Sequence, residues 1–338
     1  MKTLKEKQEE RLENISYKIQ PNFPREIFLE VNNTCNHSCL FCANAKMTRG
    51  KDFIDDELAK KIMQDAFNAG STDITFYATG EPLIFPKLAE YIKYAKNIGY
   101  SYVFLTSNAA LSTPIKMKNI IDAGLDSIKF SVNAGTRETY EKVHGKDDFD
   151  KVVENIKLWD EYRKEFGSKL KMFVSFIPTQ ITKNDYPLLL NRVGAYIDQD
   201  VDQRECSNQG GNMLENNEFE DINPENILGT LKSHQLTNIC PDPFNRITVS
   251  SEGYLTACVV DYQNALIMAD LSSISIVEAW NNKEFQDFRK KHLEDKLEGT
   301  LCHNCLKNSD LPFEPLKEEF FKPLKEDKDM EKIYDQKI

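Results

Sequence analysis

Short apolar runs alternate with amphipathic segments over the first two-thirds of the chain. The runs at 27–31, 73–78, 101–106, 127–132 and 171–177 are nearly continuous in apolar residues, as is typical of strands covered on both faces. Between them, apolar positions recur at the spacing of one helix face. The predicted helices lie at 55–69, 87–97, 115–123, 148–166 and 185–197.

This alternation predicts a parallel sheet with covering helices, because parallel strands need a crossover between them. Right-handed crossovers curl such a sheet, so we expect an α/β fold with a partial (β/α)6 barrel over residues 25–206. Ligands of such folds bind at the carboxyl ends of the strands. Polar motifs follow the first four predicted strands at those ends: TCNHSCLFC, ATGEP, TSNAA and SVNAG.

The pattern changes near residue 207, where a polar, turn-rich segment begins. Beyond it, ITVS and YLTAC flank Ser251-Glu252-Gly253 and predict a β-hairpin. Ser275 and Glu278 form a capping box that predicts a helix start. The expected organisation is an N-terminal extension (1–24), the barrel (25–206), a smaller second domain (207–315) and a charged tail (316–338).

Charge and cysteine content narrow the possible functions. The chain has 43 Lys and Arg against 54 Asp and Glu, a net charge of −11, which argues against a nucleic-acid-binding surface. No run approaches the ~20 apolar residues of a membrane span, and the charged N-terminus does not resemble a secretion signal. We therefore expect a cytoplasmic protein without a membrane partner. In that compartment, 8 cysteines indicate metal binding, catalysis or chance burial.

Three of these cysteines form the motif Cys35-x3-Cys39-x2-Cys42, in a segment that we call the cysteine loop (residues 35–42). A tetrahedral zinc ion needs four ligands, and only His37 is available nearby, at an awkward spacing. A 4Fe-4S cluster held by three cysteines would keep one iron open to another ligand. Both metals stay possible from these residues alone.

The cysteine loop, with Phe41 before its last cysteine, resembles the cluster loop of the radical S-adenosylmethionine (SAM) superfamily. Thr79-Gly80-Glu81-Pro82 is similar to the family's GGE motif, with Thr79 in place of the first glycine. The resemblance implies a SAM-binding 4Fe-4S cluster on Cys35, Cys39 and Cys42. It also implies cofactor contacts from Phe41, Thr79, Gly80, Glu81, Ser107, Asn108, Ser131 and Asn133. For the serines and asparagines, ordinary turn chemistry at strand ends is the alternative.

Membership of this family implies reductive cleavage of SAM to a 5′-deoxyadenosyl radical that abstracts a hydrogen atom from the substrate. It also implies an electron donor of the flavodoxin or ferredoxin type. The barrel interior would keep water away from the radical.

A second cysteine group comprises Cys240, Cys258, Cys302 and Cys305. Four cysteines suit a structural zinc ion, although zinc ribbons usually contain two close pairs and only Cys302-x2-Cys305 is close here. The arrangement resembles the SPASM/twitch extension of radical SAM enzymes, in the shortened form of 2-deoxy-scyllo-inosamine dehydrogenase-like proteins. That resemblance implies one fully ligated auxiliary 4Fe-4S cluster, which would exchange electrons rather than bind substrate.

The remaining candidates lie near the expected mouth of the barrel. Cys206 is a possible hydrogen donor to a substrate radical, or else a small buried apolar residue. Arg204, Arg137 and Lys129 are candidates for substrate contacts, or else ordinary solvated charges. His144 has no partner visible in the sequence.

Three function classes follow. The favoured one is a radical SAM oxidoreductase of dehydrogenase type that acts on a sugar, a cyclitol or another small polar molecule. The second is a SPASM maturase that modifies a peptide or protein, or an epimerase. Only about 25 residues precede the first strand, too few for a separate peptide-recognition domain, which disfavours the maturase. The third is a non-catalytic iron–sulfur or zinc protein, for which neither Glu81 nor the long βα series would be needed.

Overall fold

The computed structural model describes residues 6, 15–179, 181–204, 239–307, 309 and 311–321. Within these residues, one sheet contains nine strands in the order β6-β5-β4-β3-β2-β1-β7-β8-β9. The strands are β1 (Glu26–Leu29), β2 (Asp73–Thr75), β3 (Tyr102–Ser107), β4 (Ser127–Ser131), β5 (Lys171–Phe176), β6 (Asp202–Gln203), β7 (Arg246–Val249), β8 (Tyr254–Thr256) and β9 (Ile267–Asp270). Strands β1 to β6 pair in parallel, which confirms the predicted partial barrel.

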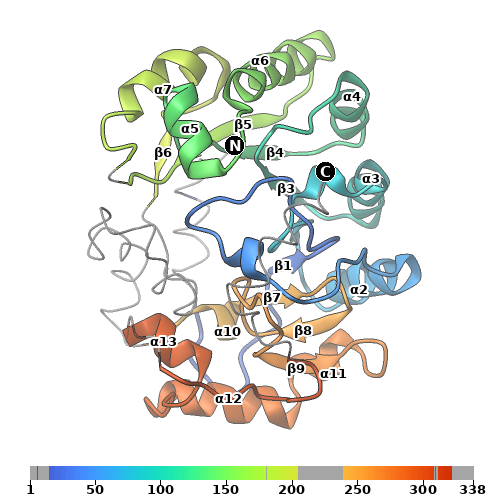
Figure 1. Cartoon of the computed structure of the whole chain (residues 1–338). Coiled ribbons are helices and arrows are strands. Elements are labelled where there is room, and N and C mark those ends of the chain that lie inside the picture. Colours follow the sequence, from blue (N-terminus) through green and yellow to red (C-terminus); the bar gives the residue numbers. More distant parts are fainter. Residues whose placement is uncertain are drawn as a thin grey trace.

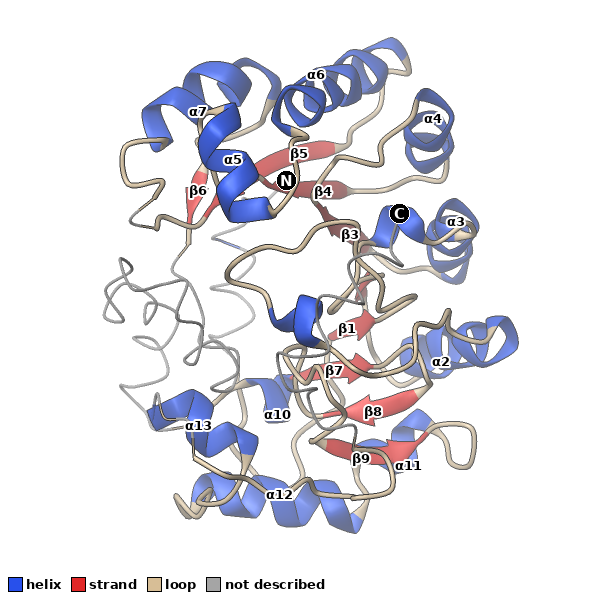
Figure 2. Cartoon of the chain, viewed as in Figure 1, coloured by secondary structure: helices blue, strands red, loops and turns tan. Residues whose placement is uncertain are grey.

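The helices are α2 (Asp56–Asn68), α3 (Leu88–Ile98), α4 (Pro114–Asp122), α5 (Arg137–His144), α6 (Phe149–Glu165), α7 (Tyr186–Val193), α10 (Asp242–Asn245), α11 (Ile276–Trp280), α12 (Lys283–Leu293) and α13 (Leu301–Lys307). Helices α2, α3, α4 and α6 lie along the outer side of the curved sheet, whereas α5 and α10 lie on its open side (Figure 1). Three short 3-10 helices accompany them: η1 (Ala43–Lys46), η2 (Pro82–Ile84) and η3 (Gly194–Tyr196). Figure 2 shows the resulting two layers, with the strands inside and α2, α3, α4 and α6 outside.

Side-chain caps explain where several helices begin. Asp55, Thr113 and Thr136 accept hydrogen bonds from the first turns of α2, α4 and α5. The predicted capping box of Ser275 and Glu278 is present at α11. Helix α5 was not predicted, because its eight residues are too few to show a clear apolar period.

The strands separate two environments. Ile27, Ile128 and Met172 belong to the core between sheet and helices. Because side chains alternate along a strand, their neighbours Phe28 and Lys129 point to the opposite side, which we call the inner face. The inner face contains Phe28 from β1, Phe104 from β3, Lys129 from β4 and Phe173 from β5, with β2 between β1 and β3.

The C-terminal hairpin continues the same sheet. Strand β7 pairs in parallel with β1, with Ile27 opposite Ile247, and β8 and β9 follow in antiparallel order. The hairpin prediction is therefore confirmed, and its strands extend the barrel sheet beyond β1. The predicted boundary near residue 207 lies outside the described residues.

A buried arginine joins the two parts of the chain. The Arg49 guanidinium donates hydrogen bonds to Glu30 (3.0 Å), to Glu252 (2.7 Å) and to the Tyr262 carbonyl oxygen (2.9 Å). The side chains of Arg49 and Glu30 are each only 1% exposed. Buried charges need such partners because desolvation is costly. The ion pairs therefore hold β1, the segment after the cysteine loop and the β7–β8 turn in one arrangement.

Replacement of Arg49 by Met should lower the free energy of unfolding by about 3–5 kcal/mol, because Glu30 would lose its buried counter-charge. Chemical denaturation of the anaerobically purified protein measures this loss. Arg137→Met is the matched control: Arg137 pairs with Asp147 at an exposed site, so no measurable loss is expected. Equal losses in the two variants would contradict the role assigned to Arg49.

Candidate functional site

The predicted motifs meet at one edge of the sheet. The cysteine loop follows β1, Thr79–Pro82 follow β2, and Ser107 and Ser131 end β3 and β4. Parallel strands bring their carboxyl ends to the same edge, so the predicted clustering of these segments is confirmed.

The three thiols of the cysteine loop lie close together, and each cysteine is partly shielded from water. Burial raises the pKa of Cys39 well above its usual value, and the neighbouring Cys42 and Cys35 raise it further. Burial also raises the pKa of Cys42. Three thiolates can share this place only if a positively charged group lies among them. The donor set therefore fits an iron–sulfur cluster held by three cysteines.

Helix α5 holds the cysteine loop in place. The backbone N–H of Ser38 donates to the His144 carbonyl oxygen (3.2 Å), and that of Leu40 donates to the Val143 carbonyl oxygen (3.0 Å). Gly145 ends the helix at φ 66°, and a Cβ atom there would lie 2.7 Å from Ser38 Oγ. Loop and helix end thus approach too closely for any other residue at position 145.

Each cysteine sulfur of the loop has a polar side chain nearby. His144 Nδ1 lies 3.3 Å from Cys39 Sγ, and the Tyr262 hydroxyl lies 3.7 Å from Cys42 Sγ. Asn108 Nδ2 lies 3.9 Å from Cys35 Sγ. The sequence patterns assigned no role at the cysteine loop to His144 or Tyr262. The only signal for such a role in the sequence is that both side chains can donate a hydrogen bond.

Gly80 and Glu81 are packed directly against the start of the cysteine loop. A Cβ atom at Gly80 would lie 2.3 Å from the Asn32 carbonyl oxygen, so only glycine fits. The Glu81 N–H donates to the Thr34 carbonyl oxygen (2.8 Å), and Asn32 Nδ2 donates to the Glu81 carbonyl oxygen (3.0 Å). These contacts fix the motif beside the cysteines.

The Glu81 carboxylate is buried and accepts three hydrogen bonds. The donors are the Leu83 N–H (3.0 Å), the Ser107 hydroxyl (2.7 Å) and the Asn108 N–H (2.8 Å). Burial raises the pKa of Glu81, and these donors oppose that shift. Ser107 and Asn108 therefore orient the carboxylate, while their predicted contact with SAM remains a prediction.

Thr79, which replaces the first glycine of the motif, is bonded to a buried acid. Its N–H donates to Glu30 (3.1 Å), and its hydroxyl donates to the same carboxylate. The Thr79 carbonyl oxygen accepts from Asn44 Nδ2 (2.8 Å). The side chain thus has a structural role that glycine could not fill.

Of the remaining predicted cofactor contacts, Ser131 is partly exposed at the end of β4, and Phe41 is buried edge-on to His144. The Asn133 amide oxygen accepts from the Ile177 N–H (2.9 Å). The Asn133 N–H donates to His144 Nε2 (3.2 Å). Asn133 is therefore occupied by protein partners, and its contact with SAM stays a prediction.

His37, the possible zinc ligand, lies beside the same thiols. Its Nε2 is 3.1 Å from Asp148, and its Nδ1 has no hydrogen-bond partner among the described residues. The ligand atoms of His37, Cys39 and His144 lie within 4.8 Å of one another. A single metal ion bound by these three residues is therefore the alternative to the cluster that the geometry allows.

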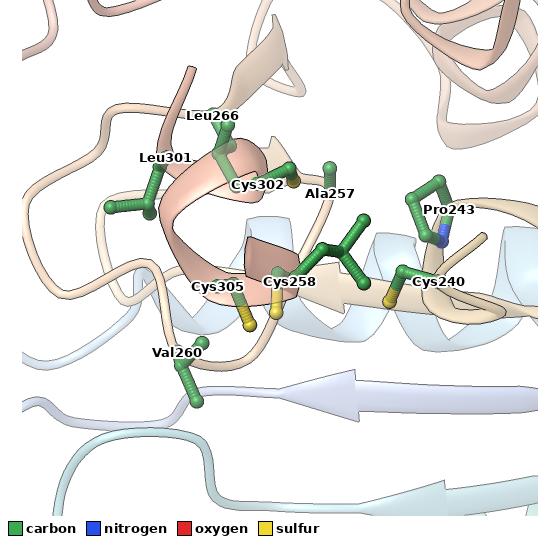
Figure 3. A pocket seen from close by; sticks show the side chains of 10 residues that line it. Cys240, Pro243, Ala257, Cys258, Val260, Leu266, Leu301, Cys302 and Cys305 are labelled. Carbon is green, nitrogen blue, oxygen red and sulfur yellow. The ribbon is translucent and has the colours of Figure 1, made fainter. Parts of the chain in front are cut away.

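The second cysteine group lines a single pocket (Figure 3). Cys240 precedes α10, Cys258 follows β8, and Cys302 and Cys305 lie on α13. The other lining residues are apolar, Pro243, Ala257, Val260, Leu266, Leu301 and Leu306. Burial raises the pKa of Cys240, Cys258 and Cys302 well above the usual value, so this donor set also fits a positively charged metal group.

The basic candidates differ in their surroundings. Arg137 is exposed and pairs with Asp147, as an ordinary surface charge would. Arg204 is partly exposed and donates to Asp202 (2.5 Å). Burial and the charge of Arg204 lower the pKa of Lys129 to about 7, with a smaller opposing effect of Asp202. Cys206 lies outside the described residues.

Two family profiles match the chain. The radical SAM superfamily profile matches residues 29–180, and the SPASM profile, described as an iron–sulfur cluster-binding domain, matches residues 240–306. The chain contains a radical SAM domain and a SPASM domain. These domains imply 4Fe-4S clusters and SAM as cofactors. The matched ranges contain both cysteine groups.

Curated relatives match only part of this chain. A protein of Saccharolobus islandicus named probable GTP 3′,8-cyclase is 33% identical over 136 residues, 39% of this chain and 42% of that protein. An uncharacterized protein of Methanocaldococcus jannaschii is 29% identical over 135 residues, 40% of this chain and 43% of that protein. The match thus spans less than half of the length of these relatives.

Solved structures share the fold. BtrN in complex with AdoMet and 2-DOIA has a TM-score of 0.57 at 19% identity, over 90% of this chain and 100% of BtrN. Streptococcus suis SuiB bound to S-adenosylmethionine has a TM-score of 0.57 at 13% identity, over 79% of this chain and 68% of SuiB. The identities are low, so these matches concern the fold alone. In the part of the chain that the structure describes, every helix is too short or too polar to cross a membrane.

Iron analysis tests the assignment of the two cysteine groups. Two 4Fe-4S clusters predict about eight Fe per reconstituted chain. The variant with Cys35, Cys39 and Cys42 replaced by Ala should keep about four Fe and lose 5′-deoxyadenosine formation from SAM and dithionite. The variant with Cys302 and Cys305 replaced by Ala should also keep about four Fe. Stoichiometric zinc in the unmodified protein, or 5′-deoxyadenosine formation by the triple variant, would contradict the assignment.

Proposed function

We propose that this enzyme oxidises a hydroxyl group of a sugar, a cyclitol or another small polar molecule to a carbonyl group. The observation that carries this proposal is the second pocket, in which four cysteines, one buried and three partly exposed, would occupy every iron of a 4Fe-4S cluster. A cluster without an open iron cannot bind substrate, so electron transfer is the role that its ligation favours. Oxidation is a reaction that needs such an acceptor.

The electron balance of this oxidation fits two clusters and one base. The bound cofactors would supply a 5′-deoxyadenosyl radical that removes one hydrogen atom, together with an acceptor for one electron. The substrate must also release its hydroxyl proton to a side chain of the protein. The sum is loss of two hydrogen atoms from the substrate and formation of a C=O bond.

The inner face offers a surface for a small polar substrate. Lys129 lies between Thr106 and Phe173 in the strand register, two residues before Ser131 at the edge that carries the motifs. Its lowered pKa leaves a share of the amine neutral at pH 7, so Lys129 is a candidate for the group that receives the hydroxyl proton. Arg204, close enough to influence that pKa, is a candidate for a contact with a substrate oxygen.

Two other substrate classes are alternatives to a sugar or a cyclitol. SuiB, which shares the fold, has been solved bound to its precursor peptide SuiA, so a peptide substrate is the second candidate. The name of the Saccharolobus relatives points to GTP, although the matched part covers only 42% of those proteins. An electron donor of the flavodoxin or ferredoxin type completes the proposal.

Product analysis in deuterated water separates oxidation from epimerisation. Anaerobic enzyme with SAM and dithionite is incubated with a panel of sugars, cyclitols, a peptide mixture and GTP. For the compound that raises 5′-deoxyadenosine formation, we expect a product two hydrogens lighter, formed equally well by Cys206→Ala. A product of unchanged oxidation state that carries one solvent deuterium, lost in Cys206→Ala, would overturn oxidation in favour of epimerisation. Turnover of GTP or of a peptide alone would overturn the substrate class.

Lys129 should become reactive towards acetic anhydride as the pH rises through about 7. Below that pH the amine is protonated and inert, and above it the neutral amine is a nucleophile. Mass spectrometry of the labelled peptides between pH 6 and 9 measures the profile. Lys283 is the control, because its hydrogen bond to Asp287 raises its pKa and keeps it protonated. Parallel profiles of the two lysines would contradict the assigned environment.

A further inference from the structure

His144 lies at the junction of the cysteine loop and α5, and its two ring nitrogens face different partners. Nε2 lies 3.2 Å from the backbone N–H of Asn133, which donates to it. A backbone N–H can only donate, so Nε2 is the unprotonated nitrogen of the ring. The ring proton must then be on Nδ1, which lies 3.3 Å from Cys39 Sγ.

The imidazole has little freedom to change this arrangement. His144 is 1% exposed, and the Tyr140 ring stacks on it at a centroid distance of 4.1 Å and an interplanar angle of 15°. His37 and Phe41 contact it edge-on at 5.5 and 6.1 Å. Its own backbone carbonyl oxygen binds Ser38, next to Cys39 in the loop. Both the ring and the sulfur that it faces are therefore fixed by the same short segment.

We propose that the Nδ1–H of His144 donates a hydrogen bond to the Cys39 thiolate and thereby raises the reduction potential of the SAM-binding cluster. Reduction adds negative charge to a cluster and its sulfurs, so a donor to sulfur stabilises the reduced state more than the oxidised state. In this proposal His144 acts through Cys39, so it is a positioning residue. The proposal rests on the cluster alone and holds whichever substrate the enzyme uses.

Geometry singles out His144 among the three polar neighbours of the cysteine sulfurs. Its distance to sulfur is 3.3 Å, against 3.7 Å for Tyr262 and 3.9 Å for Asn108. Asn108 Nδ2 donates one of its two protons to Asn36 Oδ1 at 2.9 Å, a much shorter contact than that with Cys35. The Tyr262 hydroxyl can rotate away from Cys42, whereas the His144 proton is fixed on Nδ1 by the contact of Nε2 with Asn133.

The test is the midpoint potential of the SAM-binding cluster in the reconstituted enzyme, measured by EPR-monitored redox titration. The signal that changes shape when SAM is added identifies this cluster. His144→Phe keeps the ring stacked on Tyr140 and removes the donor. We expect its reduction equilibrium to become about tenfold less favourable, a shift of about 59 mV to more negative potential for one electron. His144→Asn places an amide N–H donor as many bonds from Cβ as Nδ1 and should restore part of the shift.

The matched control is His292→Phe, because His292 is also a buried histidine (1% exposed) and lies on α12, away from the cysteine loop. It should leave the potential of the SAM-binding cluster unchanged. An unchanged potential in His144→Phe, or an equal shift in the control, would overturn the proposal.

A measurement on the unmodified chain covers the case in which His144→Phe does not retain its cluster. With 15N-labelled histidine, pulsed EPR of the reduced SAM-binding cluster should show one weakly coupled histidine nitrogen. No coupling would overturn the proposal. A strong coupling, or stoichiometric zinc held by His37, Cys39 and His144, would instead show direct metal ligation and overturn it as well.

Discussion

The cost of a charged thiolate in the cysteine loop is the constraint that shapes the site. Burial and the neighbouring Cys42 and Cys35 raise the pKa of Cys39, so its thiol stays neutral until a positively charged metal group favours loss of the proton. The structure meets this constraint in two ways. The last turn of α5 binds the backbone of the cysteine loop, and a polar side chain lies near each sulfur.

Much of the architecture could be predicted from local patterns. Strand and helix periods are properties of short windows, and the rule that parallel strands share a carboxyl edge then places the motifs together. Glu81 illustrates this well, because its position after β2 was enough to bring it beside the cysteine loop. The capping box of Ser275 and Glu278 was predictable for the same reason: all of its atoms lie within one turn.

The contacts that tune the site could not be predicted, because they join residues far apart in the chain. His144 and Cys39 are 105 positions apart, and Tyr262 and Cys42 are 220 apart. Neither pair shows a spacing that a sequence pattern could reveal. Helix α5 was missed for a different reason, since two turns with few apolar residues give no clear period. Thr79 looked like a departure from the family motif until its partner Glu30 was known.

The parallel pairing of β7 with β1 has a consequence for how the two cofactor sites can be separated. Strand β1, which leads into the cysteine loop, is an interior strand of the sheet only because β7 from the C-terminal part of the chain pairs with its second edge. A fragment ending at residue 204 would expose the backbone N–H and C=O groups of β1 as an open edge, which favours aggregation. It would also leave Arg49 without Glu252. The C-terminal part of the chain therefore completes the sheet on which the cysteine loop is built, and the two cofactor sites share one scaffold.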